Sequence, residues 1–300
     1  MANRLHPACE DPGMTPRRRL ALAAVLAASA MAALAATTAG ATPRAATPWW
    51  ITAIRADGLT PPGPGVPVAI VDTGVDMGLP LFSRRPNTLP LNGQRLRNRY
   101  QYHGSAVASL VVGTGDDGTD VRGIYPQAKL LIWNAAAARG ELTLREIVQG
   151  IDAVSARGPA VINLSLGGGF YSPDVEQAVL RAIARGSFIV ASVGNERPIV
   201  TFIARPAGEP HVFTVSSVGT DLKVSHFSSP TSGIDVTAPG EHLPVAVPHA
   251  FDESGVAVQS GTSFSSAIVS GVAAWVWTRR PSLDTSQLFE VLRRSARHLG

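Results

Sequence analysis

Short runs of apolar residues alternate with amphipathic stretches along most of this chain, beginning at Val66. Each run is rich in Val and Ile without polar alternation, which is typical of strands covered on both faces of a parallel sheet. The pattern predicts an α/β fold, a three-layer sandwich whose mostly parallel central sheet carries helices on both faces. The predicted strands are Pro67–Val71, Ala128–Trp133, Ala160–Leu164, Ser187–Ser192 and Val212–Ser217.

The stretches between these strands carry helix signals. Thr143–Arg157 repeats apolar residues at helical spacing and begins with a capping-box pattern. A second helix opens at Ser172 and Pro173, and Ser263–Arg279 is a long apolar helix. Ligands of such sheets bind where strands end and loops lead into helices, so chemically active side chains should lie at the carboxyl ends of the strands.

Residues 1–41 have the pattern of a targeting segment. Consecutive arginines at positions 17–19 precede an apolar run of about 17 residues, which is short for a membrane span. Small residues around Ala41 follow. We expect residues 1–41 to be a signal peptide, with Met14 as an alternative start, and the mature protein to be secreted or periplasmic. The alternative is an uncleaved signal that anchors the chain; after cleavage no stable membrane span is expected.

Two further regions follow the leader. Residues 42–65 contain several prolines and two adjacent tryptophans, which predicts a short, extended N-terminal arm. Residues 66–300 are predicted to form the folded domain, because the strand and helix alternation runs through them to the end of the chain.

Composition excludes several kinds of chemistry. The single cysteine, Cys9, lies in the leader, so the mature chain has no disulfide, thiolate metal site or cysteine nucleophile. The formal net charge is only +4, which gives no reason to expect a nucleic-acid partner. Arginines gather at positions 84–99, where either a solvated basic loop or an attraction for acidic substrates is consistent with the sequence.

Four polar residues lie at predicted strand or helix ends, where this fold places its chemically active side chains. Asp72 directly follows the first predicted strand, and Asn195 follows Ser187–Ser192. His103 opens a stretch of small residues that predicts a buried helix. Ser263 begins the long apolar helix, where the positive end of the helix dipole would favour an alkoxide-like oxygen. Taken alone, each has a structural alternative: a turn or cap for the Asp and Asn, packing for the His, and a helix N-cap for the Ser.

The motifs around these residues resemble, in the same order, those of the subtilisin-like serine proteases, the subtilases or peptidase family S8. Six short motifs match, and their agreement in the same order is far more specific than a match of any single motif. The matching runs span about residues 66–297 and are Val-Asp-Thr-Gly-Val around Asp72, His-Gly-Ser-x-Val-Ala at His103, Asn-Leu-Ser-Leu-Gly-Gly from Asn163, Val-Gly-Asn ending at Asn195, Phe-Ser-Ser from Phe227 with Ala-Pro-Gly from Ala238, and Gly-Thr-Ser ending at Ser263.

The resemblance implies a serine endopeptidase that cleaves polypeptides through an Asp-His-Ser triad and an acyl-enzyme intermediate. Asp72 would orient His103, which would take the proton from Ser263. Asn195, with the backbone N–H of Ser263, would bind the oxyanion. The resemblance also assigns backbone binding of an extended substrate to Ser165, Leu166 and Gly167.

Other functions share this fold. A membrane-anchored processing protease with one dedicated substrate would keep the chemistry, whereas a catalytically inactive secreted binding module would keep only the architecture. The presence of all three triad residue types favours an active enzyme. A lipase-type hydrolase would need a Gly-x-Ser-x-Gly elbow and the order Ser, Asp, His, which is opposite to the order here.

The resemblance implies that no cofactor is required for the chemistry. A structural Ca²⁺ is conceivable because the turn at residues 115–120 offers carboxylates, yet no complete ligand pattern is present and a solvated acidic turn is the simpler interpretation. The chain departs from the family at Ala267, where relatives have proline, and at Ala106, where many have a second histidine. Residues 42–65 are too few for a folding pro-domain, so we expect either unassisted folding or a separate folding or activating partner.

Overall fold

A computed structural model describes residues 47–98, 101–116, 119–137, 139–166, 171–196, 206–230 and 233–299. From Thr47 onward these residues belong to one compact unit. The expected signal peptide, residues 1–41, lies outside the described residues, and so does Gly167.

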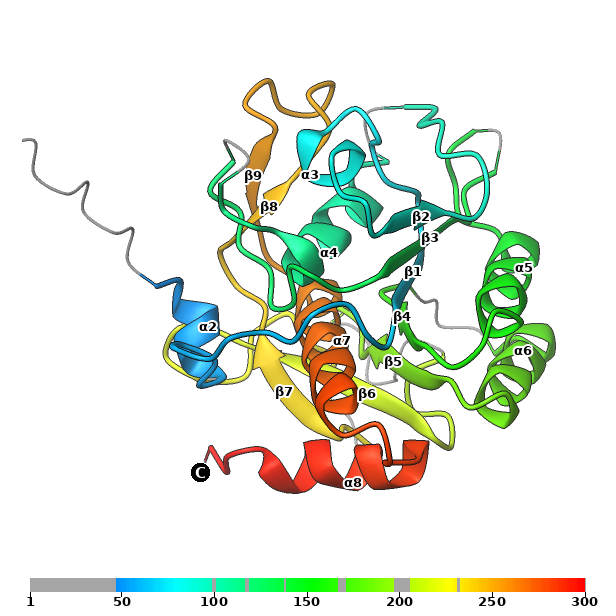
Figure 1. Cartoon of the computed structure of the whole chain (residues 1–300), viewed down its shortest axis with the longest axis vertical. Coiled ribbons are helices and arrows are strands. Elements are labelled where there is room, and N and C mark those ends of the chain that lie inside the picture. Colours follow the sequence, from blue (N-terminus) through cyan, green and yellow to red (C-terminus); the bar gives the residue numbers. More distant parts are fainter. Residues whose placement is uncertain are drawn as a thin grey trace, which may run out of the picture. The chain divides into compact units, whose positions relative to one another are not determined.

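In the described part of the chain, seven parallel strands form the central sheet in the order β2-β3-β1-β4-β5-β6-β7 (Figure 1). The predicted mostly parallel sheet is therefore confirmed, and each of the five predicted strands is present in it. These are β1 (Val68–Asp72), β3 (Leu130–Asn134), β4 (Val161–Leu164), β5 (Phe188–Ser192) and β6 (Val212–Val218).

The sequence pattern missed the edges of the sheet. Its two edge strands are β2 (Thr88–Pro90) and β7 (Val236–Pro239). A separate antiparallel pair is formed by β8 (Leu243–Ala246) and β9 (Val256–Gln259). β2, β9 and the start of β7 are at most partly buried, and β8 is largely buried but only four residues long. None of them therefore has the long apolar run that identified the interior strands.

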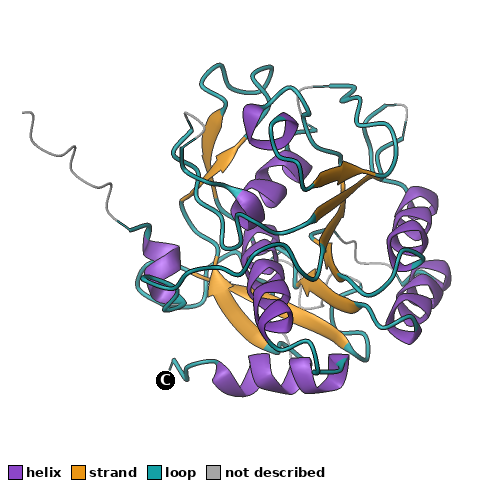
Figure 2. Cartoon of the chain, viewed as in Figure 1, coloured by secondary structure: helices purple, strands orange, loops and turns teal. Residues whose placement is uncertain are grey.

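Helices cover both faces of the sheet, as predicted (Figure 2). On one face α5 (Leu144–Ser155) packs beside α6 (Pro173–Ala184), and on the other α4 (His103–Val112) packs beside α7 (Thr262–Arg279). Among the described residues, no helix is both long and apolar enough to cross a membrane. The remaining helices are α2 (Trp49–Ala53), α3 (Pro80–Ser83) and α8 (Thr285–Ser295).

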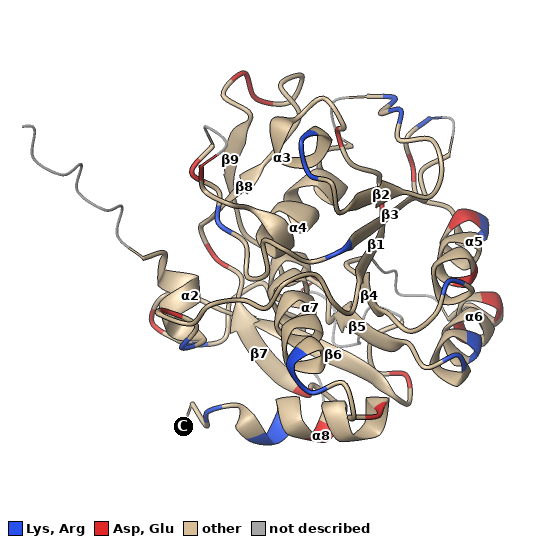
Figure 3. Ribbon diagram, in the orientation of Figure 1, with Lys and Arg blue, Asp and Glu red and all other residues tan. Residues whose placement is uncertain are grey.

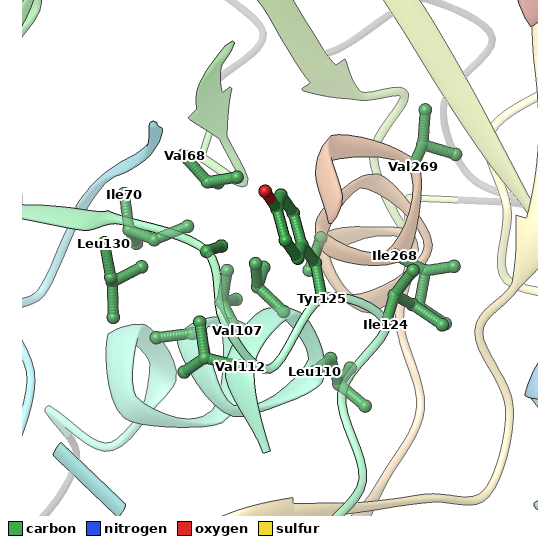
Figure 4. Packing of buried hydrophobic residues seen from close by; sticks show 14 of the residues in the cluster. Val68, Ile70, Val107, Leu110, Val112, Ile124, Tyr125, Leu130, Ile268 and Val269 are labelled. Carbon is green, nitrogen blue, oxygen red and sulfur yellow. The ribbon is translucent and has the colours of Figure 1, made fainter. Parts of the chain in front are cut away.

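Alternate residues of β1 point into two different cores, which explains why the interior strands are apolar throughout. Val68 and Ile70 belong to the cluster against α4 and α7, whereas Ala69 and Val71 belong to the cluster against α5 and α6. Figure 4 shows part of the first cluster, in which the ring of Tyr125 lies among apolar side chains from β1, α4 and α7. Both cores meet the sheet at β1, so the residue that ends this strand has a rigid support.

Part of the predicted extended arm is helical. Residues Trp49–Ala53 form α2, and Trp50 is only 4% exposed because it packs into the core on the α7 side. The buried indole gives this short helix a tertiary contact, which outweighs the low stability of an isolated five-residue helix.

The arginine-rich stretch is not simply a solvated loop. The partly buried guanidinium of Arg85 donates hydrogen bonds to the carbonyl oxygens of Pro126, at 2.7 Å, and Ala128, at 2.8 Å. Burial lowers the pKa of Arg85 to about 10. Arg85 therefore secures the backbone that leads into β3, whereas Arg99 lies outside the described residues.

Candidate active site

The structure places four of the predicted site residues at the strand and helix ends that the sequence indicated. Asp72 is the last residue of β1, His103 the first of α4, and Ser263 lies in the first turn of α7. Asn195 follows the carboxyl end of β5. The ring centroid of His103 lies 6.0 Å from that of Phe264, so the imidazole borders the start of α7.

Asp72 and His103 form a buried, charge-assisted pair. The Nδ1 atom of His103 lies 2.9 Å from Oδ1 and 3.0 Å from Oδ2 of Asp72. The carboxylate is fully buried and also accepts the backbone N–H of Thr73 at 2.6 Å. With its proton on Nδ1 facing the carboxylate, the neutral imidazole keeps Nε2 as a hydrogen-bond acceptor.

The environment of His103 changes its acidity. Burial opposes the charged imidazolium, but the negative charge of Asp72 and its hydrogen bond outweigh burial, so the pKa of His103 is raised above its ordinary value of 6.5. The His103 side chain remains 27% exposed, so part of the ring is accessible to a reactant. Such a group can act as a proton acceptor at pH values above this raised pKa.

Two glycines allow α4 to approach the loop that follows Asp72. A Cβ atom on Gly104 would lie 2.2 Å from the carbonyl oxygen of Gly74, whose own φ is 86°. The backbone N–H of Gly104 donates to Oγ1 of Thr73 at 3.0 Å. The start of α4, which carries His103, is therefore held directly on this loop.

We expect Gly104→Ala to separate α4 from the loop and to distort the pair of Asp72 and His103. The obstacle at 2.2 Å is backbone, so the helix must move, and a misplacement of about 1 Å can cost about 10²-fold in rate. The measurement is kcat/KM on a peptide substrate. Gly93→Ala is the matched control, because a Cβ there meets nothing within 4 Å. Equal activity of the two variants would contradict the close-approach argument.

Ser263 is not a helix cap. The N-cap of α7 is Gly261, and the Ser263 hydroxyl instead donates a 3.3 Å hydrogen bond to the carbonyl oxygen of Ser165. The structural alternative for this serine is thereby removed. Its Oγ lies in the first turn of α7, where the positive end of the helix dipole favours negative charge.

A buried polar chain supports the backbone of Ser263. The Ser165 hydroxyl donates to the Ser263 carbonyl at 2.8 Å, and the Asn163 amide donates to the Ser165 hydroxyl at 2.7 Å. Ser266 lies 2.8 Å from the Ser165 hydroxyl, and Ser270 donates to Oδ1 of Asn163 at 3.0 Å. Sequence reasoning assigned no role to Ser266 or Ser270; the available signal was the helical spacing of serines along α7.

The predicted substrate-binding segment leaves the sheet beside Ser263. Ser165 is 3% exposed, with its side chain turned toward α7, and Leu166 is 8% exposed and packs into the core on the α5 and α6 side. Neither side chain is therefore free to contact a substrate. Gly167 is outside the described residues, and substrate binding by this segment stays a prediction.

Asn195 is oriented by the residue that precedes the nucleophile candidate. Its Oδ1 accepts both the backbone N–H and the hydroxyl of Thr262, each at 2.9 Å. Thr262 Oγ1 in turn accepts the backbone N–H of Gly194 at 3.3 Å. With its oxygen occupied, the Asn195 amide can offer its NH₂ group elsewhere. Sequence reasoning missed this role of Thr262, although the residue lies within the quoted Gly-Thr-Ser motif.

No group of three or more His, Cys, Asp or Glu side chains is placed to hold a metal ion in the described segments. The turn at residues 115–120, considered for Ca²⁺, lies partly outside those segments. Calcium binding there stays a prediction.

The comparisons with known proteins agree with this geometry. Residues 63–300 match the family model of the subtilase family, peptidase S8. The chain is 31% identical to subtilisin BL of Lederbergia lenta over 268 residues, a match that covers 85% of this chain and 93% of that protein. It is also 31% identical to M-protease of Shouchella clausii, over 85% of this chain but only 66% of that protein, just under two thirds of its length.

Solved structures show the same likeness. The S41 psychrophilic protease has a TM-score of 0.69 and 25% sequence identity, with 83% of this chain and 90% of that chain covered. Sphericase has a TM-score of 0.68 and 25% identity, with 83% and 89% covered. The match to the family model extends over most of the chain and agrees with the fold and the ordered motifs. The chain therefore belongs to the subtilase family of serine-type endopeptidases.

Proposed function

We propose that this protein hydrolyses peptide bonds by acyl transfer, with Ser263 as the nucleophile. Ser263 Oγ attacks the scissile carbonyl while His103 Nε2 takes the hydroxyl proton, and His103 then delivers that proton to the leaving amine. Water, deprotonated by the same imidazole, hydrolyses the acyl-enzyme. The observation that carries the proposal is the pairing of the buried Asp72 with the partly exposed His103, joined at 2.9 Å beside the start of α7.

The hydrogen bond of Ser263 is compatible with this role. Its hydroxyl donates to the Ser165 carbonyl at 3.3 Å, which is long for a bond between a hydroxyl and a carbonyl. Such a weak bond is readily exchanged for one to His103, and catalytic hydrogen bonds often tighten only when the substrate is bound. A hydrogen bond between Ser263 and His103 would then complete the triad.

Asn195 is the proposed side-chain donor to the oxyanion, together with the backbone N–H of Ser263. Two hydrogen bonds from Thr262 fix the oxygen side of the Asn195 amide, so its NH₂ group is preorganised. Preorganised donors stabilise the charge that develops on the substrate oxygen without reorganising during the reaction.

We expect Asn195→Ala to lower kcat by about 10²–10³-fold with a much smaller change in KM, the magnitude found when one oxyanion donor is removed from subtilisin. The loss falls on kcat because the donor acts on charge that exists only in the transition state. Asn87→Ala is the matched control, because that side chain makes a single 3.4 Å contact with Gln127 far from the triad. A loss of less than threefold at Asn195 would exclude the assigned role.

The proposed substrate is an extended polypeptide that binds along the backbone of Ser165, Leu166 and Gly167. The position of the segment supports this, because it follows β4 directly and Ser165 exchanges hydrogen bonds with Ser263. The proposed chemistry uses no cofactor. We also propose export by the N-terminal signal, to the periplasm or outside the cell, on the basis of the basic and apolar pattern of residues 1–41.

Labelling with a fluorophosphonate probe tests the proposed activity. The folded wild-type protein should become covalently labelled, and Ser263→Ala should not. Ser282→Ala, which removes an exposed hydroxyl near the start of α8, should be labelled like the wild type. Thermal melting of each protein verifies that it is folded. A folded wild type without label, or equal labelling of Ser263→Ala, would refute the proposal.

A further inference from the structure

A groove of about 1010 Å³ runs along the edge strand β7 and contains none of the proposed catalytic residues. Its floor is β7 itself together with part of α7, including Ile268 and Val272. Its walls come from residues 53–55 at the end of α2 and from the C-terminal segment 292–299. Figure 1 shows α2, β7 and the C-terminus in the same lower-left region of the molecule.

The strand at the floor of this groove has a free edge. Among the described strands, β7 pairs with β6 alone, and the pairing is parallel. Gly240 donates its backbone N–H toward β6, to the carbonyl oxygen of Val218. Because backbone groups alternate along a strand, those of Val236 and Ala238 also face β6, whereas the N–H and C=O of Thr237 point away from it. Such an edge is a template for a further strand.

The groove also exposes apolar side chains. Val224 is 51% exposed and Leu299 is 42% exposed, and both line it. Exposed apolar residues that surround a free strand edge favour an occupant whose side chains alternate between the groove and solvent.

Cationic residues outnumber carboxylates in the lining of the groove, although three of these cations pair with carboxylates outside it. Figure 3 shows Lys and Arg in the C-terminal part of α8 and in the segment after it. Asp235 is the single carboxylate among the lining residues, and it accepts the backbone N–H of Thr214. The exposed side chains of Arg55 and Arg297 form no ion pair within the described residues. The lining cations are Arg55, Lys223, Arg293, Arg294 and Arg297.

We propose that the β7 groove binds an extended acidic segment of another polypeptide, which adds as a strand to the free edge of β7. Main-chain hydrogen bonds to Thr237 would provide affinity, and alternate apolar and acidic side chains would meet the groove and its cationic rim. The leader of this chain is a poor occupant, because residues 1–41 carry more arginines than acids. The groove is separate from the triad, so this proposal does not depend on the proposed catalytic mechanism.

Fluorescence anisotropy with a defined peptide tests the proposal on the full chain carrying Ser263→Ala, which prevents cleavage of the probe. The probe is fluorescein-labelled Glu-Val-Thr-Val-Asp-Val-Glu. One comparison peptide has lysine at each acidic position, and another has alternate backbone nitrogens methylated. We expect the unmodified acidic peptide to bind at least about tenfold more tightly than either, and its affinity to fall with added salt because rim charges are screened.

Two protein variants locate the binding site. Arg55→Glu combined with Arg297→Glu should weaken binding of the acidic peptide by about tenfold or more. Arg157→Glu, an exposed arginine after α5, is the matched control and should bind as before. Binding should also slow hydrogen exchange of the Thr237 N–H, which a purely ionic contact at the rim would not do.

Three outcomes would overturn the proposal: equal binding of the lysine peptide, no effect of backbone methylation, or no added protection of the Thr237 N–H. Absence of binding together with a stable dimer in sedimentation would also overturn it, because the edge would then be covered by a second copy of this chain.

Discussion

Replacing Ser263 with alanine should lower kcat on a peptide amide by about 10⁶-fold, the magnitude found when the nucleophile of subtilisin is removed, and should change KM little. No other hydroxyl takes its place, because the neighbouring Ser265 and Ser266 are fully buried and bonded to backbone carbonyls. Stability should hardly change, since the Ser263 hydroxyl makes one 3.3 Å hydrogen bond. Steady-state kinetics and thermal melting of the purified variant measure both effects.

Combining Ser263→Ala with His103→Ala provides the internal control. Residues that act as one catalytic unit are strongly non-additive, so the double variant should lose little more activity than the single one. A kcat within tenfold of wild type for Ser263→Ala, or a double variant that loses the product of two independent effects, would contradict the assignment of Ser263 and His103 to one proton-transfer unit.

Asp72→Asn should lower kcat by about 10⁴-fold and also shift the pH profile. The rate falls because an asparagine can stabilise the wrong tautomer of His103 and cannot stabilise the imidazolium. In the wild type, kcat/KM should rise with pH as His103 loses its proton, through a pKa above 6.5. Without the carboxylate, burial lowers that pKa with nothing to outweigh it, so the remaining activity should extend to lower pH.

The pH dependence of kcat/KM, from about pH 5 to about pH 10, measures this shift. Asp152→Asn is the matched control, because Asp152 is a partly exposed carboxylate on α5 that pairs with Arg181 at 2.6 Å, away from the triad. Its profile should overlay the wild type. A profile of Asp72→Asn that is unshifted or moves to higher pH would contradict the proposed origin of the raised pKa, as would wild-type activity that peaks at strongly acidic pH.

The interior of the fold could be predicted because a strand that is buried on both faces has an unbroken run of apolar residues in the sequence. In β1, Val68 and Ala69 serve opposite cores, so neither position tolerates a polar residue. The edge strand β7 has no such apolar run, since Val236 and Thr237 are only partly buried and Pro239 ends the strand. The helical part of the arm was missed for a related reason: only the tertiary burial of Trp50 stabilises it.

Individual site residues could be predicted from their places at strand and helix ends, but their contacts could not. The hydrogen bonds between Ser165 and Ser263 join residues 98 positions apart, and those between Asn195 and Thr262 join residues 67 positions apart. No local periodicity encodes such pairs, because they depend on the crossing of α7 behind β4 and β5. The long-range hydrogen bonds of Ser266 and Ser270 could not be predicted for the same reason, because the partners of those bonds lie far away in the sequence.

The long sequence separations have a consequence for when this protein could cut. Asp72 and His103 come from early in the chain, whereas Ser263 acquires its backbone partners only after α7 has docked against the completed sheet. A partly folded chain therefore contains every proposed catalytic side chain but does not hold them in the arrangement that catalysis needs. Under the proposed mechanism, a molecule would become active only once its own backbone is packed and protected from cleavage by neighbouring copies. Unfolding would inactivate each molecule at the same time as it makes that molecule a substrate.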